Sequence, residues 1–336
     1  MGMQKRLWMM GLTALLAAIV LLTGCSGGSK QKITIGEVTR SIFYAPQYVA
    51  LTKGFFADEG LEVELTTTPG GDRTMTALLS GNIDIALVGS ETSIYVYAQG
   101  SENPVINFAQ LTQTDGTFLV SREPIENFSW EMLRGVTFLG QRKGGMPQMA
   151  GEFTLKKHDI DPHKDMELLQ NIDFANIPAA FASGIGDFVQ LFEPQATVFE
   201  QEGRGKVVAS FGTESGRLPY TVFMARQSYI EQNKELIQKF TNAVHRAQIW
   251  VQTASLDEVT DAVLPYFEDT ERDIVKRVIE RYRSQGSYAE DPIIDVEEWN
   301  NLLDIMEEAG ELPARVDHAA IIDNSFAVAA IRHVSE

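Results

Sequence analysis

The stretch from residue 33 to residue 65 contains two alternating hydrophobic patterns with a helical pattern between them. Apolar residues at every second position predict strands over 33–38 and 61–65. The apolar spacing between them predicts a helix that ends before Gly60. Strand, helix and strand in this order predict two parallel strands joined by a right-handed crossover. The loop 40–44 should therefore lie at the carboxyl edge of the sheet, where ligands bind.

Strand and helix patterns continue to alternate through the first two thirds of the chain. Further strands are predicted over 83–88, 105–111, 117–120, 136–139, 166–170, 188–192, 207–211 and 219–225. Helices are predicted between them over 73–79, 92–99, 148–157 and 176–182. From Gln227 onward, helical spacing predicts helices over 229–253, 256–267, 271–285, 296–309 and 319–331. The chain is therefore predicted to be an α/β protein with a helical tail packed on its first lobe.

A short internal repeat predicts two similar lobes. Residues 77–84 and 180–187 both end in Ser-Gly-x-x-Asp, and each leads into an apolar strand and then a glutamate, Glu91 or Glu193. Chance similarity between two βα units is the alternative explanation. If the repeat is genuine, both glutamates lie at the carboxyl ends of related strands and face one cleft. A polar stretch near Pro124 marks the expected change of lobe, which predicts lobe 1 over 33–121 and 220–336 and lobe 2 over 122–219.

The N-terminus has the pattern of an export signal. Basic residues precede an apolar run that ends at Leu22-Thr23-Gly24-Cys25 and is too short for a spanning helix. Cys25 is the only cysteine of the chain, and its context resembles a bacterial lipobox. We expect a lipoprotein signal peptide over 1–24, lipidation (palmitate) of Cys25 and a flexible tether over 25–32; the alternative is an ordinary free cysteine. A single cysteine excludes a disulfide within the chain and a cysteine-based zinc site.

Composition and charge narrow the classes of function. The 336 residues are 44% hydrophobic, which is ample for a core, and the formal net charge is −18. Nucleic acid is not expected as a partner, because the chain would be repelled by it. Motifs of nucleophile elbows, nucleotide-binding loops and dinucleotide folds are absent from the sequence. His158 and His163 could suggest a metal, but a solvated loop is favoured there, and we expect no metal and no cofactor.

Four loops are predicted to converge on the cleft, and further polar residues lie beside them. The candidate ligand-binding residues are Phe43, Tyr44, Asp72, Ser90, Glu91, Thr92, Asp115, Gly144, Gly145, Met146, Asn176, Glu193 and Tyr220. Any of them could instead be structural: Phe43 and Tyr44 could start the core face of a helix, and Asp72 could be a helix N-cap. Acidic residues outnumber the nearby Arg40, Arg142 and Lys143, which favours an amine-, amidine- or aminopyrimidine-like ligand over a sulfonate or phosphate.

Several longer motifs resemble one known family. They are Tyr44-Ala45-Pro46 with Lys53-Gly54-Phe55-Phe56 and Glu59-Gly60-Leu61, Leu79-Ser80-Gly81-Asn82-Ile83-Asp84-Ile85-Ala86, Ala180-Phe181-Ala182-Ser183-Gly184, and Phe192-Glu193-Pro194. Over essentially the whole mature length, the chain resembles the solute-binding lipoproteins of bacterial ABC importers for aliphatic sulfonates, taurine and thiamine pyrimidine precursors. The resemblance implies a two-lobed periplasmic-binding-protein fold of type II, in which each lobe is a mixed sheet flanked by helices and the lobes close by hinge motion.

The resemblance also implies a function and partners. It implies a monomer without enzymatic activity, anchored at the extracytoplasmic face of the cell membrane, that passes a small molecule to a permease with an ATPase subunit. By this resemblance, Glu193 corresponds to the family's ligand-facing acid, and residues 89–92 correspond to its binding turn. Family members often have a tryptophan just before the acid, but this chain has Phe192 there. A thiamine pyrimidine precursor-like ligand is expected, with an aliphatic sulfonate or taurine as the alternative. A third alternative, an exported enzyme using Glu91 and Glu193 as acid and base, lacks the cysteine-rich motif of the enzymatic relatives.

Overall fold

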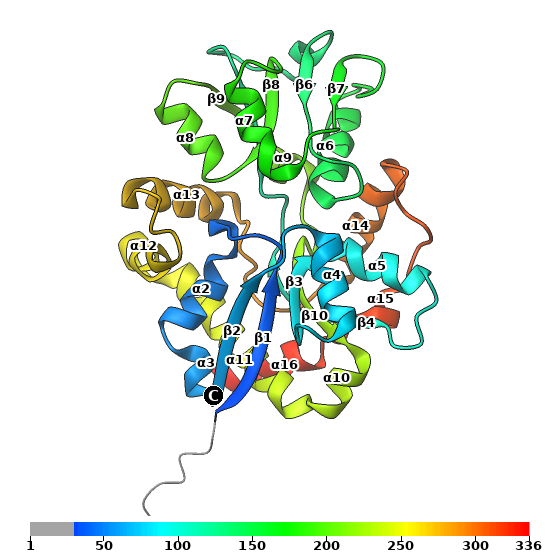
Figure 1. Cartoon of the computed structure of the whole chain (residues 1–336), viewed down its shortest axis with the longest axis vertical. Helices are drawn as coiled ribbons and strands as arrows, with labels where there is room; N and C mark the ends of the chain where they lie inside the picture. Colours follow the sequence, from blue (N-terminus) through cyan, green and yellow to red (C-terminus); the bar gives the residue numbers. More distant parts are fainter. Residues whose placement is uncertain (1–29, 336) are drawn as a thin grey trace, which may run out of the picture.

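The computed structural model describes residues 30–335, which form two lobes joined by two crossings of the chain (Figure 1). The predicted signal peptide and the predicted lipidation site at Cys25 lie outside the described residues. The first strand begins at Gln31, so only the end of the predicted tether over 25–32 is described. Within 30–335, no helix combines the length and the apolar character needed to cross a membrane.

The first lobe contains a five-stranded mixed sheet. β1 (Gln31–Glu37) lies between β2 (Leu61–Thr67) and β3 (Ile85–Gly89) and is parallel to both. β10 (Thr221–Arg226) continues the sheet, antiparallel to β3 and to β4 (Val105–Thr112). The predicted strand–helix–strand unit is therefore confirmed, and the loop after β1 lies at the carboxyl edge of this sheet.

The second lobe repeats this arrangement. β6 (Thr137–Leu139) is parallel to β7 (Glu167–Leu169) and β8 (Phe188–Phe192), and β5 (Thr117–Ser121) is antiparallel to β8 and β9 (Lys206–Ser210). The two strand orders, β2-β1-β3-β10-β4 and β7-β6-β8-β5-β9, are equivalent. β3 and β8 occupy the same place in their sheets, so the repeat that precedes Glu91 and Glu193 reflects two related lobes.

The chain changes sheets earlier than the sequence predicts. The expected boundary at 121/122 places residues 117–120 in lobe 1, but β5 pairs with β8 and β9 of the second sheet. The first crossing therefore lies between Thr112 and Thr117, and the return crossing lies between Ser215 and Thr221. The first crossing leads directly into β5 of the second sheet, and the return crossing leads directly into β10 of the first sheet. The two lobes are therefore connected by short segments.

Helices cover both sheets. In the first lobe, the chain after β1 forms η1 (Ile42–Tyr44), α2 (Ala45–Thr52) and α3 (Phe55–Asp58), and α4 (Gly71–Ser80) and α5 (Glu91–Ala98) flank β3. The second lobe is flanked by η2 (Trp130–Leu133), α6 (Met146–Lys157), η3 (Phe174–Asn176), α7 (Ile177–Ala182), α8 (Gln195–Gln201) and α9 (Phe211–Ser215). One hydrophobic cluster runs from the first sheet through the lobe junction into the second lobe.

The tail is helical, as predicted, but with two additional breaks. It consists of α10 (Gln227–Gln232), α11 (Lys234–Thr253), α12 (Leu256–Val263), η4 (Leu264–Tyr266), α13 (Arg272–Gln285), α14 (Val296–Glu308), α15 (His318–Ile321) and α16 (Ser325–Ser335). The helix predicted over 229–253 breaks at Asn233. The helix predicted over 319–331 breaks because Ile322 makes a β-bridge to Asn107. α11 packs against α2 and α16, whereas α13 and α14 reach the second lobe (Figure 1).

Candidate functional site

Aromatic side chains from both lobes meet at the junction. The Phe43 ring lies 4.9 Å from the Tyr282 ring, 5.6 Å from the Tyr220 ring and 6.2 Å from the Phe192 ring, measured between centroids. Gly116 of the first crossing lies beneath them, because a Cβ atom there would be 2.9 Å from Phe43 and 3.0 Å from Phe192. Phe43 and Tyr44 are both buried here and belong to the hydrophobic cluster that runs through the junction.

Glu91 enters this junction from the start of α5. Its side chain folds back over Gly89, where a Cβ atom would collide with the carboxylate, and it is 5% exposed. Oε1 accepts a hydrogen bond from the backbone N–H of Met146 in the second lobe (3.4 Å), whereas Oε2 has no partner among the described residues. Burial raises the pKa of Glu91 to about 7, because the ionised carboxylate loses its hydration.

Asp115 and Tyr220 approach the junction from the two crossings. Asp115 is fully buried, and its Oδ1 accepts hydrogen bonds from the backbone N–H (2.7 Å) and the hydroxyl of Thr117. Burial raises the pKa of Asp115 to about 6. Asp115 Oδ2 and the Tyr220 hydroxyl lack a partner of good hydrogen-bond geometry among residues 30–335. Burial and the nearby charges of Asp115 and Glu91 raise the pKa of Tyr220 well above its usual value.

These residues form one unit, which we call the junction cluster: Glu91, Asp115 and Tyr220, with Phe43 and Tyr44 around them. Among residues 30–335, Glu91 Oε2 has no partner, and Asp115 and Tyr220 have only each other at a poor hydrogen-bond geometry. Buried polar groups in proteins are nearly always paired, and unpaired ones call for a specific explanation such as a ligand. The junction cluster is therefore the candidate binding site between the lobes.

Glu193 lies at the end of β8, as predicted, but its carboxylate is already paired. It accepts hydrogen bonds from the backbone N–H (2.8 Å) and the hydroxyl (2.9 Å) of Thr197, and it forms an ion pair with Arg281 of α13 at 2.5 Å. Arg281 also pairs with Glu200 at 2.6 Å. Burial raises the pKa of Glu193, and the charge of Arg281 partly opposes this rise. Glu193 thus serves the contact between lobes, and it is not free to act as acid or base together with Glu91.

The remaining predicted residues divide into two groups. Ser90 and Thr92 are buried beside Glu91, where Ser90 donates to the backbone oxygen of Pro219 and Thr92 donates to that of Gly89 (2.7 Å). Gly144, Gly145 and Met146 form the turn that opens α6 and faces Glu91.

Asp72 and Asn176 are exposed and stand apart from the junction cluster. Asp72 lies in the first turn of α4 and is not its N-cap, which is Gly70. Its carboxylate pairs with Arg142 of the second lobe at 3.8 Å.

Sequence reasoning missed the residues that hold the junction. Glu37 ends β1 fully buried and accepts hydrogen bonds from Arg40 (2.6 Å), Gln47 (3.0 Å) and Tyr48 (2.8 Å). A charged residue inside the alternating run 33–38 was the signal that could have identified it. Tyr282 donates to the backbone oxygen of Gly116 (2.9 Å) and accepts from the backbone N–H of Glu193 (3.3 Å). Nothing in the local pattern of α13 distinguishes this tyrosine from a core residue.

The two histidines of the loop after α6 make separate contacts. His158 Nε2 lies 2.9 Å from Glu214, and His163 Nε2 lies 3.2 Å from Glu152. Across residues 30–335, no group of three or more histidine, cysteine, aspartate or glutamate side chains is placed to hold a metal ion.

Comparison with known proteins identifies the family. A model of the NMT1-like family matches residues 26–263, which is more than half of the chain. The chain belongs to the NMT1-like family. A relative from Bacillus subtilis (strain 168), named "Putative binding protein YtlA", is 60% identical over 296 residues, which cover 88% of this chain and 89% of the relative.

Solved structures share the fold of this NMT1-like protein. A protein from Bordetella bronchiseptica RB50 is 24% identical with a TM-score of 0.74, over 92% of this chain and 99% of the other. The alkanesulfonate-binding protein SsuA from Xanthomonas axonopodis pv. citri, solved with bound MOPS, is 16% identical with a TM-score of 0.70, over 89% of this chain and all of the other. The expected two-lobed α/β fold is therefore confirmed. The solved structures show the fold that this chain shares, and the binding role in their names and in the name of the Bacillus subtilis relative is that of those proteins.

Proposed function

We propose that this NMT1-like protein captures a small planar or amine-bearing nutrient between its lobes, outside the cell, and delivers it to an ABC permease with an ATPase subunit. A thiamine pyrimidine precursor represents the class of ligand. The observation that carries the proposal is the junction cluster, in which Glu91 Oε2 is a buried acceptor without a partner among residues 30–335, and Asp115 has only the Tyr220 hydroxyl near its second oxygen. A ligand with N–H donors would satisfy both oxygens, and the surrounding rings would cover a planar group.

The charges around the junction support an amine over a sulfonate. A sulfonate needs free cationic or N–H donors, but the nearby arginines are already paired: Arg40 with Glu37, Arg281 with Glu193 and Glu200, and Arg142 with Asp72. The carboxylate oxygens of Glu91 and Asp115 would repel a sulfonate. The alkanesulfonate-binding relative shares only the fold, so its ligand is the alternative that the experiment has to separate.

An enzymatic role finds little support at this site. An acid–base pair of Glu91 and Glu193 would need both carboxyls to reach a substrate, whereas Glu193 is bound by Thr197 and Arg281. Binding without turnover is the function that the geometry favours. The lipid anchor on Cys25 and the placement at the extracytoplasmic face belong to the same proposal, and they rest on the sequence of the N-terminus.

Native mass spectrometry of the mature protein tests the ligand class directly, because a co-purified small molecule is identified by its mass. Titration calorimetry on the stripped protein would then compare aminopyrimidines, amines and alkyl sulfonates. We expect stoichiometric binding of an aminopyrimidine or amine, weakened about tenfold or more by Glu91→Gln or Asp115→Asn. The matched control is Glu62→Gln, an exposed glutamate on β2. Binding of a sulfonate, or equal affinity in Glu91→Gln and wild type, would refute the ligand assignment while leaving the transport role intact.

A further inference from the structure

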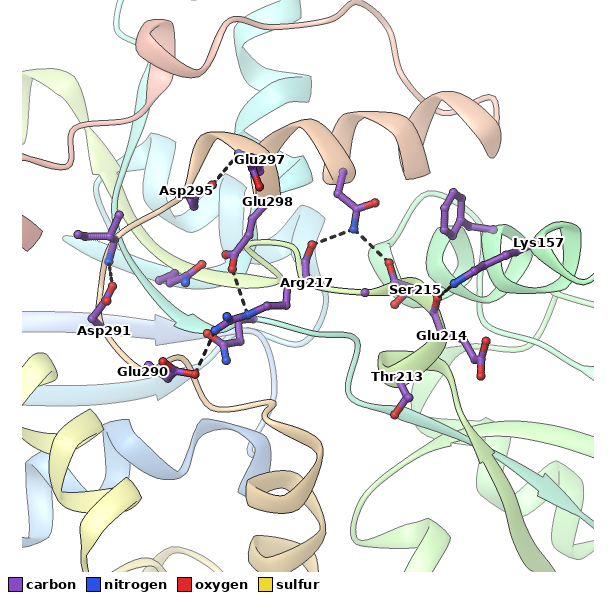
Figure 2. A pocket seen from close by; sticks show the side chains of 16 residues that line it. Lys157, Thr213, Glu214, Ser215, Arg217, Glu290, Asp291, Asp295, Glu297 and Glu298 are labelled. Carbon is purple, nitrogen blue, oxygen red and sulfur yellow. Dashed lines mark hydrogen bonds and ion pairs between the residues drawn. The ribbon is translucent and has the colours of Figure 1, made fainter.

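A cavity lies on the seam between the lobes, and none of the junction-cluster residues lines it. Its volume is about 770 Å³, which is within the range of small-molecule sites. We call it the seam cavity; it is lined by α6 and α9 of the second lobe, by Gln110 and Gln113 near the first crossing, by Arg217 of the return crossing, and by residues 290–301. Figure 2 shows Glu214 and Lys157 on one side of it and Asp291, Asp295 and Glu298 on the other.

The seam cavity is strongly acidic. Six carboxylates line it against two cations, Lys157 and Arg217; the acids are Glu214, Glu290, Asp291, Asp295, Glu297 and Glu298. Arg217 is shared between Glu290 (3.4 Å) and Glu298 (3.2 Å), as Figure 2 shows. Among residues 30–335, the hydrogen bonds to the carboxylates of Asp291 and Asp295 come from the backbone N–H groups of Ile293 (2.9 Å) and Glu297 (2.6 Å). Two cations cannot neutralise six carboxylates, so the cavity favours a positively charged occupant.

A second observation, independent of the charge, points to a ligand. Among residues 30–335, the Ser215 hydroxyl that lines the seam cavity has no hydrogen-bond partner, and Gln110 Oε1 and Glu298 Oε2 lack one of good geometry although these two side chains contact each other. Gln110 and Ser215 are each only 3% exposed. Two of these atoms can only accept a hydrogen bond, and the hydroxyl can accept one. An occupant with several N–H donors would satisfy all three.

The arrangement of the acids favours an organic cation over a metal ion. Among residues 30–335, no three acidic or histidine side chains converge as metal ligands. The acids are instead distributed along a cavity of small-molecule size, from Glu214 on the second lobe to Asp291 on the first. We propose that the seam cavity is a second binding site, distinct from the nutrient site, for an organic cation that carries several amino groups, such as a linear polyamine.

Spermidine is the probe that tests this proposal. Titration calorimetry on the mature protein should show one spermidine bound, and the variant Glu298→Gln/Asp291→Asn should bind it about tenfold more weakly. Both changes keep the shape of the side chain and remove one charge each. The matched control is Glu62→Gln/Glu235→Gln, which removes the same total charge at exposed positions on β2 and α11 and should bind as wild type does.

Each other outcome overturns the proposal in a distinct way. Equal weakening in both double variants would mean general attraction to an acidic protein, and no weakening in either would mean that the cavity does not bind spermidine. Loss of spermidine binding in Glu91→Gln, with full binding in Glu298→Gln/Asp291→Asn, would assign the amine to the junction cluster. If circular dichroism shows that the cavity variant is unfolded, Glu297→Gln replaces it, with an expected loss of about threefold, because it removes one exposed charge from the same cavity.

Discussion

Replacing Arg281 with methionine would remove the positive charge that the tail contributes to the second lobe. Arg281 lies on α13 and pairs with Glu193, whose side chain has no exposed surface, at 2.5 Å. In the variant, the Glu193 carboxylate would keep its two bonds from Thr197 but would have no opposite charge beside it. Methionine keeps most of the aliphatic volume, so the measured effect would report the lost charge.

The size of the effect follows from burial. Removing one partner of a fully buried ion pair costs about 3–5 kcal/mol. Arg281 is 24% exposed and Glu193 keeps both Thr197 bonds, so we expect a loss of about 2–3 kcal/mol in the free energy of unfolding. The double variant Arg281→Met/Glu193→Gln should recover most of this loss, because it leaves no fully buried charge unpaired and Glu200, which also loses Arg281, is 23% exposed and keeps the bond from the Val207 N–H.

The loss should also depend on pH. Burial already raises the pKa of Glu193, and removing Arg281 removes a charge that opposes this rise. A carboxyl whose pKa is higher in the folded state destabilises that state only when it is ionised. The destabilisation is therefore absent at low pH and grows as the pH rises toward the folded-state pKa. The deficit of Arg281→Met relative to wild type should therefore be larger at pH 8 than at pH 5.

Urea unfolding followed by circular dichroism at the two pH values would measure both effects. A deficit below about 0.5 kcal/mol at pH 8 would mean that the pair behaves as an exposed salt bridge. A deficit that stays the same in the double variant would show that the loss comes from packing and not from an unpaired Glu193.

Three further predictions concern other parts of the molecule. Glu91→Gln should stabilise the ligand-free protein by about 3 kcal/mol at pH 8, because the pKa of the Glu91 carboxyl rises to about 7 on folding. At pH 4 the carboxyl is protonated in both the folded and the unfolded state, so the variant and wild type should be equally stable. A difference in urea unfolding that does not depend on pH would contradict this. Gly116→Ala should cost about 1–3 kcal/mol, since the new methyl must displace the rings of Phe43 and Phe192, and unchanged urea unfolding would contradict this. Cys25→Ser should move the protein from the detergent phase to the aqueous phase of whole-cell extracts, and unchanged partitioning would rule out lipidation at this residue.

Hydrophobic periodicity predicted most elements because it reports which face of each segment is buried. The alternation at 33–38 and 61–65 is typical of strands, and both strands are present. The same signal carries no information about which sheet a strand joins, so β5 was placed in the wrong lobe. It also did not reveal the break at Ile322, because the bridge to Asn107 depends on a distant part of the chain.

The sequence predicted where the two glutamates of the candidate site lie, but it predicted their roles only in part. Glu91 and Glu193 were placed at the ends of equivalent strands, and they are at the ends of β3 and β8. Their environments differ because Arg281, 88 residues after Glu193, pairs with that carboxylate. No spacing in the sequence links α13 to the end of β8. Which acid has an opposite charge beside it is therefore a property of the tertiary contacts, and Glu91 and Asp115 could be distinguished from Glu193 only in the structure.

The place of β10 in the first sheet has a consequence for the order in which the lobes fold. β10 lies between β3 and β4, so the sheet that begins at Gln31 lacks an interior strand until residues 221–226 are available. All strands of the second sheet lie within 117–210. During synthesis the chain emerges with its N-terminus first, so the second lobe is the first to have all its strands available. The lobe that carries the N-terminus therefore has to wait for the later sequence, and the inserted lobe can serve as a folded neighbour while the first sheet closes.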